Sequence, residues 1–115
     1  MNPFIGITGN TKLQWKAREG PFTWKVWNKL KELDDSCWVK IHGTNYGHAG
    51  VPDILGCYNG RFVGIELKRP DGKGKTSPKQ KEWINKINRT GGVAAVISSL
   101  EELEDFLTKI ERGDL

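Results

Sequence analysis

Cysteine and histidine are scarce in this chain, with two of each among 115 residues. Neither pair has the CxxC or HxxxH spacing of metal-ligating motifs, so a structural zinc site is not expected. Cys37 and Cys57 are predicted to be free, buried thiols, because unpaired cysteine behaves as a small hydrophobic residue. No apolar run approaches the length needed to cross a membrane, so we expect a soluble protein without a membrane partner.

The N-terminus also lacks the charged start, apolar stretch and cleavage site of a secretory signal, which favours the cytoplasm. A hydrophobic content of 37% is typical of globular proteins, and a chain of this length can bury one core. We therefore expect a basic N-terminal arm over residues 1–18, irregular in structure, and a single domain over residues 19–115.

The net charge of +4 is unevenly distributed along the chain. Residues 68–81 hold six basic side chains and one acid, whereas residues 101–115 hold six acids and two bases. The first 18 residues add Lys12, Lys16 and Arg18 without an acid. This separation is expected of a protein that holds nucleic acid on one face, although solvated surface lysines give the same counts.

Hydrophobic periodicity and turn residues predict the order α-β-β-β-α-β-α. The expected elements are a helix over 21–34, strands over 37–41, 54–58 and 61–67, a helix that starts at Ser77-Pro78 and stops at Gly91-Gly92, a strand over 93–97, and a helix that starts at a Ser99–Glu102 capping box. Since the fourth strand follows a helical crossover, we expect an α/β fold with a mixed central sheet between helices. This order is an α-β-β-β-α-β core with an added C-terminal helix.

Asn59-Gly60 is a strong signal for a two-residue hairpin turn. In that register Tyr58 pairs with Arg61, and Asp53 lies opposite Glu66. Opposed residues point to the same face, with Cβ atoms about 4.5–5.5 Å apart. Lys68, two residues beyond Glu66, shares this face.

Two opposed carboxylates repel each other unless a positive charge lies between them. Lys68 neutralises only one charge, whereas Mg²⁺ or Mn²⁺ suits a pair of carboxylate ligands. Such a cation activates water for phosphodiester hydrolysis, and a neighbouring lysine can orient that water. The alternative is a surface salt-bridge cluster of Asp53, Glu66 and Lys68.

These residues resemble a known family. Gly50-Val-Pro-Asp53, then Ile65-Glu66-Leu67-Lys68 after a hairpin, then Ser77-Pro-Lys-Gln80 at a helix start resemble the PD-(D/E)XK nuclease superfamily. Within it, they are most similar to the stand-alone virus-type replication-repair nuclease (VRR-NUC) domains of phages and bacteria. The resemblance covers about residues 19–108. It implies that the expected α-β-β-β-α-β order is the restriction-endonuclease-like core of this superfamily.

The resemblance implies that Asp53 and Glu66 are metal ligands, that Lys68 is the catalytic lysine and that Gln80 supports the site. Gln80 has a competing structural role, because Ser77-x-x-Gln80 is itself a capping box. The family usually has a further acid on the first helix. Glu19 is the best match for this metal ligand, and Glu32 is the weaker option.

Basic residues beside the site are candidates for phosphate contacts, namely Arg69, Lys73, Lys75 and Lys79. His42 and His48 are candidates for a general base or a DNA contact, although a loop histidine is more often neither. Trp15, Trp24 and Trp38 could stack on unpaired bases. Core packing is the more common role for Trp27, Trp38 and Trp83.

The sequence thus predicts a Mg²⁺- or Mn²⁺-dependent DNA endonuclease, selective for branched or junction DNA and low in sequence specificity. A homodimer is plausible, because one compact site cuts one strand at a time. The main alternative is a catalytically silent DNA-binding module with a nuclease fold. A restriction-type enzyme usually has further recognition elements, for which this chain has little room.

Overall fold

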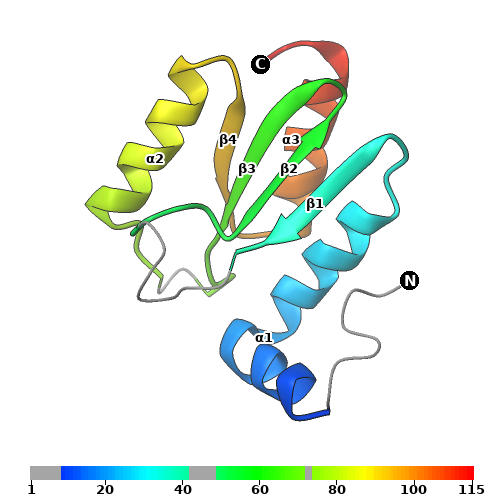
Figure 1. Cartoon of the computed structure of the whole chain (residues 1–115), viewed down its shortest axis with the longest axis vertical. Coiled ribbons are helices and arrows are strands. Elements are labelled where there is room, and N and C mark those ends of the chain that lie inside the picture. The colour runs from blue at the N-terminus through cyan, green and yellow to red at the C-terminus, as the bar shows by residue number, and fades with distance from the viewer. Residues whose placement is uncertain (1–8, 42–48, 72–73) are drawn as a thin grey trace.

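The computed structural model describes the backbone of residues 9–41, 49–71 and 74–115, and side chains from residue 20 onward within these ranges. The elements are α1 (Gly9–Lys31), β1 (Ser36–Lys40), β2 (Ile54–Tyr58), β3 (Arg61–Leu67), α2 (Pro78–Arg89), β4 (Val93–Ile97) and α3 (Leu100–Arg112). Their order and the mixed four-stranded sheet confirm the predicted α/β fold (Figure 1). Within the described ranges, no helix combines the length and the apolar character of a membrane span.

The first helix differs most from the prediction. The backbone of residues 9–18 is helical, so the prediction of an irregular arm is wrong for this segment. These residues carry no apolar stripe, but lysine, leucine, glutamine, alanine and arginine have high intrinsic helix propensity. Gly20 interrupts the helix with φ 79° and ψ 170°, and Pro21 starts the second part, as predicted. That part ends at Lys31, three residues before the predicted end.

The sheet has the order β1-β2-β3-β4. In the β2–β3 hairpin Tyr58 pairs with Arg61 and Ile54 with Ile65, which confirms the predicted register. Asn59 and Gly60 have φ values of 53° and 77°, the positive values of a type I′ turn. β4 pairs in parallel with β3, and β1 forms the opposite, antiparallel edge, starting and ending one residue before its predicted range.

Helices cover both faces of the sheet. Val63 and Ile65 on β3 are fully buried in the core beside α1 and α3. On the other face, a Cβ on Gly64 would lie 3.1 Å from Ile87 of α2. The main core comprises Trp24, Val26, Trp27, Leu30, Ile54, Tyr58, Val63, Ile65, Val93, Ile97, Leu103, Phe106, Leu107 and Ile110.

Two predictions about exposure are wrong. Trp24 is only 8% exposed and belongs to this core, so it does not present a surface for stacking on bases. Cys37 and Cys57 are free, as predicted, but both are exposed. They lie on β1 and β2. Their face of the sheet is the one on which α2 packs, but α2 packs over β3 and β4.

Side-chain caps fix the starts of α2 and α3. Ser77 and Gln80 form the predicted capping box at α2. At α3, the Ser99 hydroxyl accepts a hydrogen bond from the Glu102 N–H at 3.1 Å. The Glu102 carboxylate, however, accepts hydrogen bonds from Ser98, both N–H and hydroxyl, so the predicted reciprocal box is present only in half.

Candidate active site

The segment before β2 is held against the rest of the sheet. Pro52 is fully buried, and its Cγ lies 3.2 Å from the place where Gly64 would carry a Cβ. The Asp53 carbonyl accepts a hydrogen bond from the Ile41 N–H at 2.7 Å. The carboxylate accepts another from the Leu67 N–H, at 2.8 Å from Oδ2. Asp53 is therefore fixed at the end of β3, as the hairpin register predicts.

Gly50 allows this segment to touch α2. Its φ is 84°, and a Cβ there would lie 2.5 Å from the backbone carbon of Lys79. Any other residue would be strained by the dihedral and would collide with backbone. The Gly-Val-Pro-Asp sequence thus joins the segment that carries Asp53 to the helix that carries Gln80.

Glu66 is the buried acid of the site, with 2% of its surface exposed. Its Oε2 accepts a hydrogen bond from the Gln80 amide at 2.7 Å and lies 3.5 Å from the Lys68 ammonium. Its Oε1 is buried without a hydrogen-bond partner. Burial, then the negative charge of Asp53, raises the pKa of Glu66 to about 7, although the Lys68 ammonium acts in the opposite direction.

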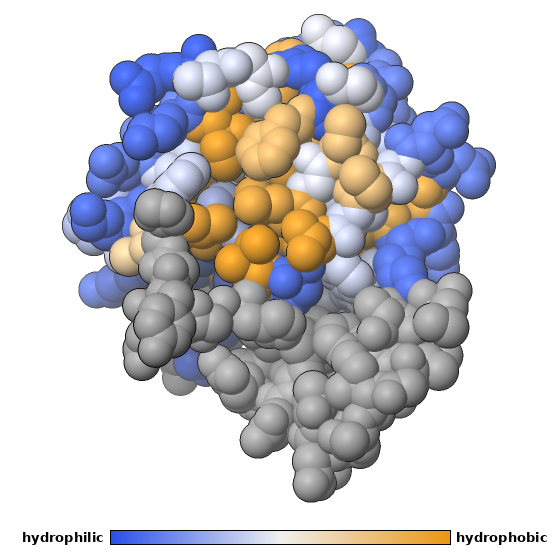
Figure 2. Space-filling model, viewed as in Figure 1, coloured by the Kyte–Doolittle hydropathy of each residue, from blue (hydrophilic) through white to orange (hydrophobic). Residues whose placement is uncertain are grey.

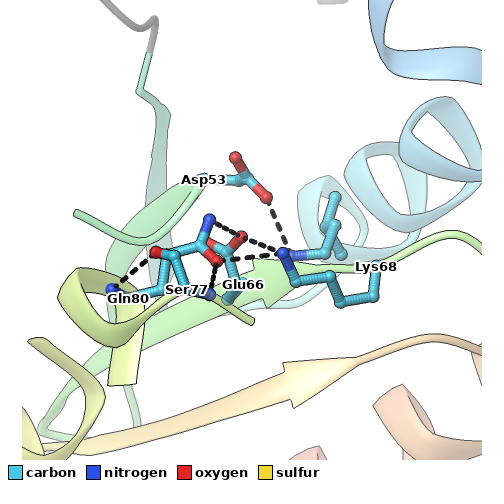
Figure 3. Close-up of polar contacts among 6 residues, drawn as sticks. Asp53, Glu66, Lys68, Ser77 and Gln80 are labelled. Carbon is cyan, nitrogen blue, oxygen red and sulfur yellow. Dashed lines mark hydrogen bonds and ion pairs between the residues drawn. The ribbon is translucent and has the colours of Figure 1, made fainter. Parts of the chain in front are cut away.

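Gln80 forms hydrogen bonds with Glu66, Lys68 and Ser77 (Figure 3). Its Oε1 accepts hydrogen bonds from the Lys68 ammonium at 3.0 Å and from the Ser77 N–H at 2.8 Å. Because both partners are donors, the oxygen must face them. The amide nitrogen then faces Glu66 and donates to it. The helix cap therefore fixes how Gln80 contacts the carboxylate.

Comparison of the chain with protein-family models, with curated proteins and with solved structures found no match.

A pocket of about 550 Å³ opens beside these side chains. It is lined by Asp53, Glu66 and Lys68, by the start of the second part of α1 and by the segment after β3, residues 69–71. The Lys68 side chain is 15% exposed and so can meet a ligand there. The sequence did not predict that residues 20–23 form a wall of this pocket, because that contact depends on how α1 packs. The Gly20-Pro21 break was its only local signal.

The described residues provide two carboxylates for a cation. Within the described part of the chain, no three His, Cys, Asp or Glu side chains lie close enough to form a metal cluster. The predicted third acid, Glu19, has its side chain outside the described residues, although Gly20, next to it, lines the pocket. Glu32 is exposed just beyond the other end of α1 and does not line this pocket, so it does not fit that role.

The predicted phosphate-binding residues lie close to the site in sequence and are exposed where described. Arg69 lines the pocket and pairs with Asp71 at 2.6 Å, which neutralises part of its charge. Lys75 and Lys79 are exposed, and Lys79 lies 3.9 Å from Glu82. Lys73, His42 and His48 lie outside the described residues, as does the side chain of Trp15.

Proposed function

We propose that the chain is a Mg²⁺- or Mn²⁺-dependent DNA endonuclease of the PD-(D/E)XK type, similar to VRR-NUC domains. The observation that carries this proposal is the Glu66 carboxylate, buried with one oxygen unpartnered beside Asp53 and Lys68. A buried carboxylate oxygen without a partner is costly, and a site that keeps one commonly has a functional reason.

A divalent cation would satisfy this pair of acids. Glu66 Oε1 is the available oxygen, and Asp53 supplies a second carboxylate whose Oδ2 is oriented by the Leu67 N–H. Hard oxygen donors suit Mg²⁺ and Mn²⁺, which keep several water ligands and need few protein ligands. Glu19 is the proposed third ligand. A bound cation of this kind supplies charge neutralisation and an acidified water for phosphodiester hydrolysis.

Lys68 is suited to act on the reacting groups. Its ammonium is held by Gln80 and partly balanced by Glu66, and it faces the pocket. In hydrolysis, water oxygen adds to phosphorus and one P–O ester bond breaks. A fixed ammonium can hold the attacking water and stabilise the negative charge that develops on the phosphate oxygens.

DNA is the proposed substrate because a run of basic residues follows Lys68 directly in the sequence. Arg69, Lys73, Lys75 and Lys79 are proposed to contact phosphates, which position a duplex without reading its sequence. Low sequence specificity follows, and branched or junction DNA is the proposed target. A homodimer would bring two such sites to opposite strands.

A DNA-binding module that does not cut is the competing function. Two carboxylates beside a polyanion weaken simple binding through repulsion, so their retention favours catalysis. A salt-bridge cluster is a weaker explanation, because Lys68 lies 3.5 Å from Glu66 Oε2 while Oε1 keeps no partner.

The test is cleavage of a panel of linear, flap and four-way-junction DNAs with Mg²⁺, Mn²⁺ or EDTA. We expect cleavage with either metal, none in EDTA, and a preference for branched substrates. Lys68→Ala should lose cleavage and keep DNA binding. Lys31→Ala, at an exposed lysine at the far end of α1, is the matched control and should cut normally. Metal-dependent cleavage that survives Lys68→Ala would contradict the proposed site.

A further inference from the structure

Cys37 and Cys57 are directly opposite each other in the β1–β2 pair. The register continues to Ile41 and Asp53, which are joined by a backbone hydrogen bond of 2.7 Å. Hydrogen-bonded and non-hydrogen-bonded pairs alternate along an antiparallel ladder. Cys37 lies four residues before Ile41, so the cysteines also form a hydrogen-bonded pair. Cα atoms of such a pair are typically about 5.5 Å apart, inside the range of about 4.4–6.8 Å found for disulfides.

Both thiols project from the same sheet face, because cross-strand partners point the same way. This is the face opposite to Ile54 and the core beside α1 and α3. In Figure 1 α3 lies behind the strands, so the viewer looks at the opposite face of the sheet. Figure 2, in the same view, shows hydrophobic side chains gathered in the middle of this face. Val39 and Phe62, which alternate onto this face, are 53% and 49% exposed. Both cysteines are exposed as well, so a small oxidant can reach either thiol.

We infer that Cys37 and Cys57 form a thiol modification site that closes reversibly into a cross-strand disulfide. With hydrogen peroxide as oxidant, one thiolate attacks a peroxide oxygen and becomes a sulfenic acid, releasing hydroxide that is protonated to water. The second thiol then displaces the sulfenic oxygen as a second water and forms the S–S bond. Two thiols thus lose two electrons and two protons, and the peroxide is reduced to two water molecules.

The bond requires a small movement of the strands. Directly opposed Cβ atoms lie about 4.5–5.5 Å apart, whereas a disulfide needs about 3.5–4.5 Å. β1 is an edge strand with a neighbour on only one side, so it can shift more easily than a central strand. A bond formed with such distortion at an exposed position is readily reduced, which makes the site reversible. The site is independent of the proposed nuclease function.

The test uses the full chain, reduced and then exposed to hydrogen peroxide. We expect both thiols to disappear from a thiol titration under denaturing conditions, with an intact mass lower by two hydrogen atoms. The protein should remain monomeric on a non-reducing gel, and dithiothreitol should restore both thiols. Because the chain has no other cysteine, the titration measures this pair alone.

The matched control moves one thiol along β1. The double variant Cys37→Ser/Val39→Cys keeps two exposed cysteines on the same face, but Val39 pairs with Leu55 and is only diagonal to Cys57. Diagonal neighbours are about 7–8 Å apart, so we do not expect the internal bond to form. Retention of both thiols by the wild type would overturn the inference. So would covalent dimers in place of the internal bond, or equal oxidation of the double variant.

Discussion

The raised pKa of Glu66 gives a stability test that needs no substrate. Its pKa is raised from 4.5 to about 7, chiefly by burial. Because the folded state holds this proton more tightly than the unfolded chain, protonated Glu66 adds stability that is complete below about pH 4.5. That contribution is lost as the pH rises through about 7. The difference between the two pKa values corresponds to about 3 kcal/mol of unfolding free energy.

Glu66→Gln removes this titration and should remove the associated pH dependence. The assay is urea unfolding of both proteins in EDTA at about pH 5 and about pH 8. Relative to the variant, the wild type should lose about 2–3 kcal/mol between the two conditions. The carboxylates that do not interact with Glu66 are the same in both proteins and cancel in the comparison. Any cost of placing an amide N–H where Oε1 now lies is independent of pH and also cancels.

Glu101→Gln is the charge-matched control, because Glu101 is an exposed acid on α3 outside the pocket of the site. It should leave the pH dependence of the wild type unchanged. If Glu66→Gln gives a curve parallel to that of the wild type, burial does not raise the pKa of Glu66, and the electrostatic basis of the proposed metal site is lost. Saturating Mn²⁺ should stabilise the wild type near neutral pH and the Glu66→Gln variant far less, since the cation binds only the folded site.

Three further predictions concern the two acids of the site and the basic segment that follows Lys68. Asp53→Asn removes a negative charge that raises the pKa of Glu66, so the pH-dependent loss of stability should move to lower pH in urea unfolding without metal; an unchanged midpoint would argue against coupling of the two acids. Below the Glu66 pKa of about 7, binding of Mn²⁺ by the wild type should release about one proton and should tighten as the pH rises, whereas above this pKa the proton release should vanish; calorimetry in two buffers of different ionisation enthalpy measures it. Binding below this pKa without proton release would show that Glu66 is not a ligand. Neutralising Lys73 and Lys75 together should weaken DNA binding and reduce its salt dependence by about 0.9 in log K against log salt for each phosphate that is no longer bound, and an unchanged slope would remove this segment from the binding surface.

The parts of the fold that the sequence predicted depend on local signals. The Asn59-Gly60 turn requires positive φ at both residues, and this requirement alone sets the β2–β3 register. β4 is a short apolar run between turn residues, and its bounds were predicted correctly. The burial of Cys37 and Cys57 was predicted wrongly, because the exposure of a sheet face depends on where a helix packs. α2 lies over β3 and β4, and nothing in the sequence near the cysteines specifies this.

The same distinction applies to the candidate site. Asp53, Glu66 and Lys68 could be brought together from strand pairing alone, and the structure places them so. The hydrogen bond from the Leu67 N–H to Asp53 and the wall formed by residues 20–23 could not, because they depend on tertiary packing. Glu19 was chosen because the family that the sequence resembles usually has an acid on its first helix, and its role stays a prediction.

Gln80 shows why two roles that looked like alternatives in the sequence are compatible. A capping glutamine must present its oxygen to the N–H at the helix start, and Gln80 does this with Ser77. That constraint leaves the amide nitrogen as the atom facing Glu66, where only a donor is acceptable to a carboxylate. The second lone pair of the same oxygen then receives the Lys68 ammonium. The Gln80 side chain that caps the first turn of α2 therefore also orients Glu66 and Lys68 in the proposed site. A glutamate in this position could cap the helix equally well, but its second oxygen would face Glu66 as a second acceptor, so glutamine is the residue that satisfies both requirements.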